Sequence, residues 1–439
     1  MNILDKTDLI NNDEIKRVTK IIKQLFNENK YNRKKLSKLF DNYLIPQEIE
    51  KKNNAEVSTP YELRKDMLDK IPIKFWSNPK HTVFEPCCGK SGFLLDIIDR
   101  FMEGLKVFEP VEIKRYEYIV KNCLYYADIN PLNIYISELL LNPNKNLKLN
   151  YYEGNTLELN INEKFGLDYF DSIIGNPPYN DKSGNKGKNH TLWDKFILYS
   201  LNILKKKGYL LFVHPSIWRQ INNKILNLYK NKQLLYIEIH NVKDGLKTFK
   251  CSTRYDWYLL ENIKPYIYTF IRDENNILNK IHINEWDFIP NMYFTKIQKL
   301  LSNNNTLDVW RHRSTYSTEK KKLVSKEKNK SFKYPLVYSI KKNNTISLRY
   351  TNDNKKGHFG LSKFIFSNGA GFYCDIEGKY GLTEWAYCIY DKPENLKNIE
   401  KTFRSEKFNK IKKAIHLDSS TYNIKVMKLF KKDFWKDFI

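Results

Sequence analysis

Long apolar runs are absent from this chain of 439 residues, and no stretch approaches the roughly 18–20 apolar residues that span a bilayer. A helical membrane protein is therefore excluded. The first ten residues, MNILDKTDLI, place acids where a signal peptide needs a basic and then an apolar segment. We expect a soluble intracellular protein, located in the cytoplasm or, if the chain is viral, in the host cytoplasm or the virion.

Cysteine is scarce, with six residues in the whole chain, which excludes a disulfide framework. Cys87 and Cys88 are adjacent, and no two cysteines have the two-residue spacing of a structural zinc site. The histidines also lack metal-ligand spacing. We expect buried free thiols and no bound metal.

Acidic residues are in deficit, because 75 Lys and Arg face 50 Asp and Glu, a net charge of +25. Most of this excess lies in residues 265–439, which carry 33 basic and 18 acidic side chains. A basic field of this size attracts polyanions, of which nucleic acid is the commonest. The chain is also rich in Asn, Ile and Tyr, as products of AT-rich genomes are, so a solvated lysine-rich surface explains the charge equally well.

The spacing of apolar residues divides the chain into three regions. Residues 1–52 have helical spacing and predict a small helical N-terminal segment. Residues 53–264 alternate short, β-rich apolar runs with helical stretches, which predicts a doubly wound α/β domain. Residues 265–439 are predicted to form a basic C-terminal α+β domain. Because doubly wound sheets bind ligands at the carboxyl ends of their strands, the loops after the strands should hold the chemistry.

The segment Asn176-Pro177-Pro178-Tyr179 follows the fourth expected strand, FDSIIG. The two prolines fix φ, donate no N–H and hold the residues before them extended. The Asn176 side-chain oxygen and the Pro177 carbonyl can then act together as fixed acceptors, with the Tyr179 ring as a stacking plane. This combination suits a planar group that carries an –NH2, such as adenine or an amide. A turn with a solvated asparagine is the alternative.

The loops after the first three expected strands offer further ligand contacts. Residues Glu85 to Phe93 contain a turn at Gly89 that lets backbone N–H groups approach a ligand, but the upstream glycine of a phosphate-binding loop is missing. Asp128 ends the second strand and can accept hydrogen bonds from ribose hydroxyls, or else cap the next helix. Asn155, after the third strand, can meet a purine edge.

The order of these motifs resembles that of the S-adenosylmethionine-dependent DNA adenine-N6 methyltransferases of the gamma class. In that class a cofactor motif comes first, as Glu56-Val57-Ser58-Thr59-Pro60 does here, and target recognition is C-terminal. The resemblance covers residues 52–264 and implies a Rossmann-like sheet of seven strands with helices on both faces. It implies site-specific methyl transfer from S-adenosylmethionine to the N6 amine of an adenine flipped out of double-stranded DNA. A separate restriction endonuclease is a further candidate partner.

The resemblance also implies roles for single residues. The catalytic positions are Asn176, Pro177, Pro178 and Tyr179. The cofactor-binding positions are Thr59, Pro60, Glu85, Pro86, Gly89, Phe93, Asp128 and Asn155, and here Asn155 and Ser91 replace the family's usual Asp and Gly. The substrate-binding positions are Lys182, Lys186, Lys188 and Phe249, the last as a second aromatic beside the target base or else as a core residue. Candidate DNA contacts of the C-terminal region are Trp310, Arg311, Arg313, Lys341, Lys342, Arg349, Lys355 and Lys356.

Three other functions stay open. The same pocket would serve an RNA adenine-N6 methyltransferase, although a long recognition region favours duplex DNA. A protein glutamine methyltransferase, such as those of release factors, shares the Asn-Pro-Pro-Tyr motif but lacks a large basic C-terminal segment. An inactive binding module is disfavoured because Asn176, Asp128 and Gly89 are all present.

Overall fold

The computed structural model describes residues 57–142, 144–180, 191–311, 315–417 and 422–439, together with residues 16–17, 19–21, 24 and 38. Most of the helical segment expected over 1–52 lies outside the described residues, as do Glu56, Arg313 and the loop that carries Lys182, Lys186 and Lys188. The chain divides into two compact units, Met1–Trp218 with Lys224–Glu285 and Arg219–Asn223 with Trp286–Ile439. Within the described residues, no helix combines the length and apolar character needed to cross a membrane.

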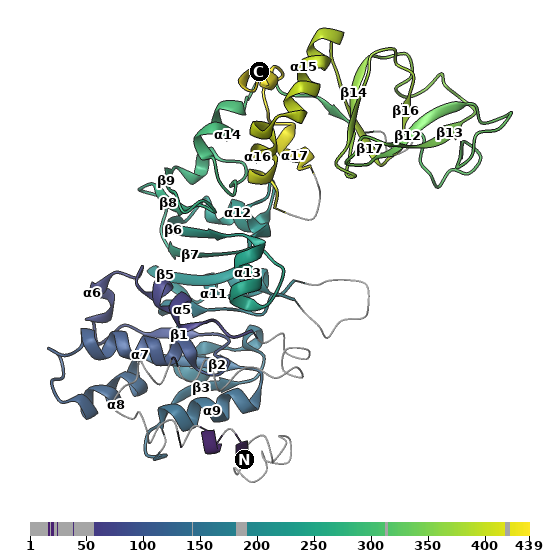
Figure 1. The fold of residues 1–439 in the computed structure, drawn as a ribbon. Coiled ribbons are helices and arrows are strands. Elements are labelled where there is room, and N and C mark those ends of the chain that lie inside the picture. The colour runs from purple at the N-terminus through teal and green to yellow at the C-terminus, as the bar shows by residue number, and fades with distance from the viewer. Residues whose placement is uncertain are drawn as a thin grey trace. The chain divides into compact units, whose positions relative to one another are not determined.

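A mixed sheet forms the centre of the first unit, with the strand order β3-β2-β1-β4-β5-β7-β6-β8-β9 (Figure 1). Strands β3 to β5 in this order are parallel, whereas β7 runs antiparallel to both β5 and β6. The bounds are β1 (Val83–Glu85), β2 (Leu124–Asp128), β3 (Asn150–Glu153), β4 (Phe170–Gly175), β5 (Leu204–Pro215), β6 (Gln233–His240), β7 (Tyr255–Glu261), β8 (Thr269–Arg272) and β9 (Leu278–Ile281).

This sheet has nine strands where seven are expected. Strand β8 pairs in parallel with β6, and β9 pairs antiparallel with β8. The first compact unit therefore extends to Glu285 rather than to the expected boundary at residue 264. Both added strands have only four residues, and of their side chains only Thr269, Ile271 and Ile281 are buried, so their apolar signal is weak.

Helices cover both faces of the sheet, because alternate strand residues point to opposite sides. Val83, Leu211 and Trp257 share one core with residues of α5, α6, α7, α8 and α9. On the other face Phe84 stacks on Phe170 with ring centroids 4.8 Å apart, and Phe165 of α10 packs beside them. Each fully buried side chain of this size contributes roughly 1.5–3 kcal/mol to stability. The helices are α5 (Tyr61–Leu68), α6 (Ile73–Trp76), α7 (Gly92–Gly104), α8 (Glu112–Asn122), α9 (Pro131–Leu141), α10 (Ile161–Phe165), α11 (Trp193–Asn202), α12 (Lys224–Tyr229) and α13 (Val242–Phe249).

The second unit combines two four-stranded sheets with short helices. One sheet has the order β10-β17-β14-β15 and the other β11-β13-β12-β16. A core cluster joins them, with Val337 of β12, Ile365 of β14 and Cys388 of β17 among its members. The strands are β10 (Val309–Trp310), β11 (Val324–Ser325), β12 (Tyr334–Ile340), β13 (Ile346–Thr351), β14 (Lys363–Ser367), β15 (Phe372–Asp375), β16 (Gly381–Leu382) and β17 (Ala386–Tyr390). The helices are α14 (Phe294–Leu300), α15 (Pro393–Arg404), α16 (Glu406–Ala414) and α17 (Ile424–Met427).

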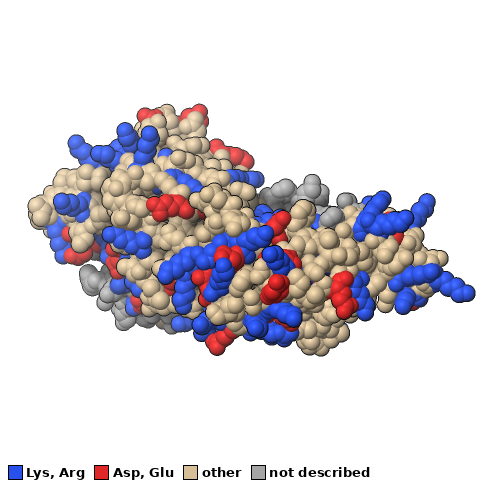
Figure 2. Space-filling model, turned by 90° about the horizontal axis from the view of Figure 1, so that it is seen from above, with Lys and Arg blue, Asp and Glu red and all other residues tan. Residues whose placement is uncertain are grey.

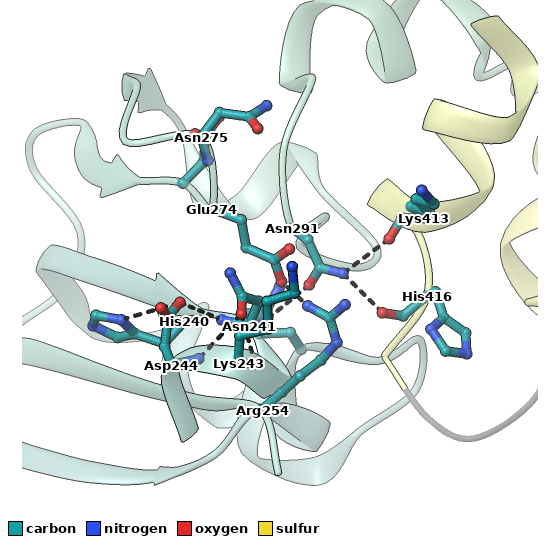
Figure 3. A network of polar contacts seen from close by, with 12 residues as sticks. His240, Asn241, Lys243, Asp244, Arg254, Glu274, Asn275, Asn291, Lys413 and His416 are labelled. Atoms are coloured by element: carbon teal, nitrogen blue, oxygen red, sulfur yellow. Dashed lines mark hydrogen bonds and ion pairs between the residues drawn. The ribbon is translucent and has the colours of Figure 1, made fainter. Parts of the chain in front are cut away.

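Buried polar groups anchor the helical part of the second unit. The Asn291 side chain is buried and donates to the carbonyls of Lys413 at 3.1 Å and His416 at 2.7 Å, at the end of α16 (Figure 3). Its Oδ1 accepts from Arg219 at 2.9 Å. Both the oxygen and the nitrogen of the Asn291 amide are therefore hydrogen-bonded. The amide nitrogen satisfies carbonyls at the end of α16 that would otherwise lack donors.

The six cysteines are all free, and all lie within the described residues. Cys88, Cys123 and Cys388 are buried, whereas Cys251 is exposed. The expectation of free thiols is confirmed. The expectation that they are buried is wrong for Cys251, which lies in the turn between α13 and β7, and holds only in part for Cys87 and Cys374.

Candidate active site

The glycine turn after β1 is tied to the end of β2. Gly89 has a φ of 48°, in the left-handed region that favours glycine. Its N–H donates to Asp128 Oδ2 at 2.8 Å, and the Cys88 N–H donates to the Ala127 carbonyl at 2.9 Å. Two loops that are distant in sequence thus form one hydrogen-bonded edge.

Asp128 is not the N-cap of α9. The cap is Asn130, whose side chain accepts from the Leu132 N–H at 3.1 Å. Asp128 is buried, and its Oδ1 accepts from the Asn130 N–H at 2.8 Å and from the Asn133 side chain at 3.2 Å. The carboxylate therefore joins the glycine turn, the end of β2 and the start of α9, and it lies where ribose contacts are expected.

Ser91, at a position where the resemblance implies glycine, also adopts a left-handed conformation, with a φ of 69°. Such a backbone is unfavourable for a residue with a Cβ. The Ser91 hydroxyl lies 2.6 Å from the hydroxyl of Ser137 on α9, and both side chains are fully buried. This hydrogen bond offsets part of the backbone cost, so the turn is kept without the glycine.

Glu85 ends β1 as a buried carboxyl group. It is 2% exposed, and its Oε2 has no hydrogen-bond partner among the described residues. Burial raises the pKa of Glu85 well above its usual value, although the nearby Arg64 guanidinium opposes this. An acceptor left open in a buried strand-end loop is suited to a cationic group of a ligand, such as an ammonium.

Asn176 lies against this edge, because β4 pairs with β1 and a Cβ at the preceding Gly175 would be in contact with Pro86 and Glu85. The Asn176 amide donates to Thr59 Oγ1 at 3.1 Å and to the Val57 carbonyl at 3.4 Å. Its Oδ1 is buried and has no partner within the described residues. The structure thus brings together the Thr59, Glu85 and Asn176 motifs and leaves one strong acceptor available.

Tyr179 has a hydroxyl that is buried and lacks a partner among the residues described here. Burial raises its pKa far above the usual value, and the neighbouring Tyr255, Cys251 and Asp256 add to this effect. The hydroxyl therefore stays protonated. The tyrosine is available for contact through its ring rather than through acid–base chemistry.

Phe249 is 7% exposed and packs edge-on against Tyr255, with ring centroids 4.8 Å apart. It ends α13, which begins with a capping box between Asn241 and Asp244 (Figure 3). Phe249 belongs to the same core cluster as Phe93. The packing of Phe249 is that of a core residue, which is one of the two interpretations given above. Its role as a second aromatic beside the target base stays a prediction.

Two further residues that are expected to bind the cofactor, Asn155 and Phe93, make contacts within the protein. The Asn155 side chain accepts from the Leu157 N–H at 3.2 Å and donates to Glu158 at 2.6 Å. Thr156, which the motif analysis did not single out, donates to the Pro86 carbonyl at 2.7 Å and so holds the loop after β3 against the loop after β1. Phe93 is 3% exposed and supports the turn from the core.

A buried ion pair also belongs to the site, and sequence analysis missed it. Arg64 of α5 donates through Nε to Asp96 of α7 at 2.6 Å, and the side chains are 1% and 6% exposed. Arg64 also donates to the Thr59 carbonyl. An arginine on a short surface helix normally reaches solvent, so no local pattern announces its burial.

The candidate DNA contacts of the second unit are mostly exposed. Trp310 is 44% exposed, and Trp385, which the sequence analysis did not single out, is 47% exposed. The Arg349 guanidinium lies 4.2 Å from the centroid of the Tyr338 ring, which in turn packs edge-on to Trp385. Figure 2 shows many projecting Lys and Arg side chains with acidic residues among them, rather than one continuous basic surface. Arg311 differs from the others, because it donates to the Glu384 carbonyl and packs over a tyrosine ring within the unit.

Comparisons with known proteins add a partial family match. Residues 122–251, from the end of α8 to just past α13, match the Eco57I restriction-modification methylase family. No curated protein matches the chain. Similar solved structures include a modification subunit of a putative type I restriction enzyme from Vibrio vulnificus YJ016, with 18% identity, a TM-score of 0.40, and coverage of 54% of this chain and 51% of that chain.

Two further structures show a similarly distant likeness. A putative class I S-adenosylmethionine-dependent methyltransferase from Listeria monocytogenes has 17% identity and a TM-score of 0.40, covering 55% of this chain and 72% of that chain. The type IIL restriction-modification enzyme MmeI, in complex with DNA, has 12% identity and a TM-score of 0.47, covering 92% of this chain and 65% of that chain. The match spans about half the length of the Vibrio subunit. TM-scores below 0.5 are too low for a function to be assigned from these structures.

Proposed function

We propose that the chain is a site-specific DNA methyltransferase of the restriction-modification type, which transfers a methyl group from S-adenosylmethionine to the N6 amine of an adenine in duplex DNA. The observation that carries this proposal is the buried Oδ1 of Asn176, which has no partner within the described residues and follows Gly175, itself packed against Glu85 and Pro86. The family match over residues 122–251 includes this asparagine and supports the methylase class.

The residues at the strand ends fit the proposed cofactor. Glu85 offers an open, buried acceptor for the ammonium of the methionine part, and Asp128 offers carboxylate oxygens for the ribose. Asn155 lies at the end of the next strand, on the side where the adenine ring would be held. When bound, S-adenosylmethionine supplies an electrophilic methyl group on a positively charged sulfur.

The Asn-Pro-Pro-Tyr segment prepares the target amine for attack. The N6 lone pair of adenine is delocalised into the ring and is a poor nucleophile. Asn176 Oδ1 and the Pro177 carbonyl accept the two N6 hydrogens and so favour a pyramidal nitrogen whose lone pair points at the methyl carbon. The nitrogen forms its bond to that carbon as the carbon–sulfur bond breaks, and it then loses a proton to solvent. Preorganised hydrogen-bonding groups of this kind are worth roughly 10²–10³ in rate.

The target base must leave the duplex to reach Asn176, which costs a few kcal/mol of lost stacking and pairing. The Tyr179 ring replaces part of this stacking. The basic second unit supplies phosphate contacts, and its exposed Trp385 and the Arg349–Tyr338 pair are candidates for base contacts.

Methyl transfer from labelled S-adenosylmethionine tests the proposal, with duplex DNA, an RNA of matching sequence and a protein extract as parallel acceptors. Labelled N6-methyladenine in the duplex is the expected product, and mapping the modified positions gives the recognition site. Label found only in RNA or only in protein would contradict duplex DNA as the substrate. Binding of S-adenosylmethionine without transfer to any acceptor would contradict the activity.

A further inference from the structure

We infer that Thr59 is a positioning residue for Asn176, and that the buried Arg64–Asp96 ion pair holds Thr59 in place. This inference rests on the proposed function and deepens it. The resemblance implies only a cofactor contact for Thr59, whereas the structure connects its hydroxyl directly to the catalytic amide.

The first step is the orientation of the Asn176 amide. The Val57 carbonyl, 3.4 Å from Nδ2, can only accept a hydrogen bond, so the –NH2 end of the amide must face it. The Thr59 hydroxyl, at 3.1 Å, accepts the second amide hydrogen. With both hydrogens used on this side, Oδ1 is directed away from Thr59 as the acceptor that remains open.

The second step is the restraint on Thr59 itself, which is 6% exposed. Arg64, in the first half of α5, donates to the Thr59 carbonyl and pairs with Asp96 at 2.6 Å. Both charged side chains are buried, and removing either one would leave the other buried without its partner, a costly change. The backbone at Thr59 is therefore fixed to α7, the helix that follows the glycine turn.

The third step is the requirement for glycine at position 92, in the first turn of α7. A Cβ there would lie 2.7 Å from Arg64 Nη1 and 2.8 Å from Cζ, so a side chain at this position would displace the guanidinium from its contacts with Asp96 and Thr59. Gly92 therefore makes room for the buried guanidinium. A series of contacts thus runs from Gly92 through Arg64 and Thr59 to Asn176. It links the glycine turn to the catalytic amide as one rigid assembly.

Thr59→Val tests the inference, because it preserves the shape of the side chain and removes the oxygen that accepts from Asn176. We expect the single-turnover rate of methyl transfer to fall about tenfold, the effect of one lost hydrogen bond, while the calorimetric affinity for S-adenosylmethionine changes by less than about twofold. Thr59→Ser retains the hydroxyl and should restore most of the rate. Thr295→Val, the same change at an exposed position of α14, is the matched control.

A second readout does not depend on activity. With ¹⁵N-labelled asparagine, the side-chain –NH2 signal of Asn176, identified by its loss in Asn176→Asp, should shift in Thr59→Val and return in Thr59→Ser. An unshifted signal together with an unchanged rate would overturn the inference. A rate loss that follows cofactor affinity, with the signal unshifted, would make Thr59 a cofactor contact only. If the wild-type chain methylates nothing, the proposed function fails, and the amide signal still decides whether Thr59 positions Asn176.

Discussion

The two compact units differ in how their functional polar groups are held. In the first unit, Asn176, Asp128 and Arg64 are bonded to named partners; Asp128, Arg64 and the Oδ1 of Asn176 are buried. In the second unit, Trp385 is 47% exposed, and the partly exposed Arg349 guanidinium lies over the Tyr338 ring. Chemistry that requires an atom to be placed within a few tenths of an ångström needs the first kind of support. Attraction of a charged polymer tolerates the second kind.

The largest expected effect is that of Asn176→Ala. It removes the open acceptor and should lower the single-turnover rate by roughly 10²–10³, with little change in cofactor affinity. Asn176→Asp retains an acceptor oxygen and should retain part of the rate. Single-turnover assays and calorimetry measure the two quantities. Loss of cofactor affinity in Asn176→Ala would mean that the residue binds the cofactor instead.

The next effect is that of Asp128→Ala, which should weaken S-adenosylmethionine binding about tenfold or more. The carboxylate is the proposed ribose contact and also accepts from Gly89 and Asn133, so the thermal stability should fall as well. Asp128→Asn keeps one acceptor and tests how much of the loss needs the charge. Unchanged calorimetric affinity in both variants would leave Asp128 with a structural role alone.

Substitutions in the second unit should change the affinity for DNA and should not change the affinity for S-adenosylmethionine. Lys320, Lys321 and Lys322 are to be replaced by Ala. The slope of log K for DNA binding against log salt concentration should then become shallower by roughly one for each DNA phosphate that these lysines neutralise. Arg349→Ala should cost about 1–3 kcal/mol on the cognate sequence if the guanidinium reads a base, and less on other sequences. Lys74→Ala, exposed on α6, is the control. Equal losses of affinity from Arg349→Ala on all sequences would mean that Arg349 binds a phosphate only.

Protonation of two buried histidines of the first unit should lower its stability in acid. Burial lowers the pKa of His214 and of His240 to about 4, below the ordinary 6.5. Between these values each histidine binds more protons in the unfolded chain than in the folded one, so each contributes a loss of stability as pH drops through this window. The raised pKa of Glu85 contributes in the opposite direction. The slope is at most about 1.4 kcal/mol per pH unit for each histidine. Urea unfolding at pH 7, 6 and 5 measures it. His214→Phe retains an aromatic ring that can stack on Trp193 and should reduce the slope. An unaltered slope would mean that groups other than His214 cause the loss of stability in acid.

The smallest expected effect is that of Tyr179→Phe. The hydroxyl has no partner within the described residues, so its removal should change the transfer rate by less than about twofold. Tyr179→Ala removes the ring and should lower the rate clearly, since stacking of an aromatic side chain on a base is worth roughly 1–3 kcal/mol. Single-turnover assays compare the two. A large loss in Tyr179→Phe would show that the hydroxyl contacts substrate.

The sequence predicts the first unit better than the second for a physical reason. Strand-end motifs such as Glu85 to Gly89 need particular residues for their backbone geometry, so they can be recognised in the sequence, and the doubly wound order follows from alternating apolar runs. The Arg64–Asp96 pair, the Ser91–Ser137 hydrogen bond and the Thr59–Asn176 contact could not be predicted, because they join residues that only the tertiary fold brings together. Strands of two to seven residues with mixed burial, such as β10 and β13, leave no clear periodicity in the second unit.

The position of β7 has a consequence for how the chain reaches its native state. This strand is made after β6, yet it lies between β5 and β6, so β6 has no partner on that side until residue 261 has been synthesised. Until then β5 exposes an open edge, and the sheet is complete only when β8 and β9 have followed β7. Late closure of non-local strands slows folding and exposes edges that can pair with other chains. Nascent chains shorter than about 285 residues should therefore be the species that depend most on chaperones.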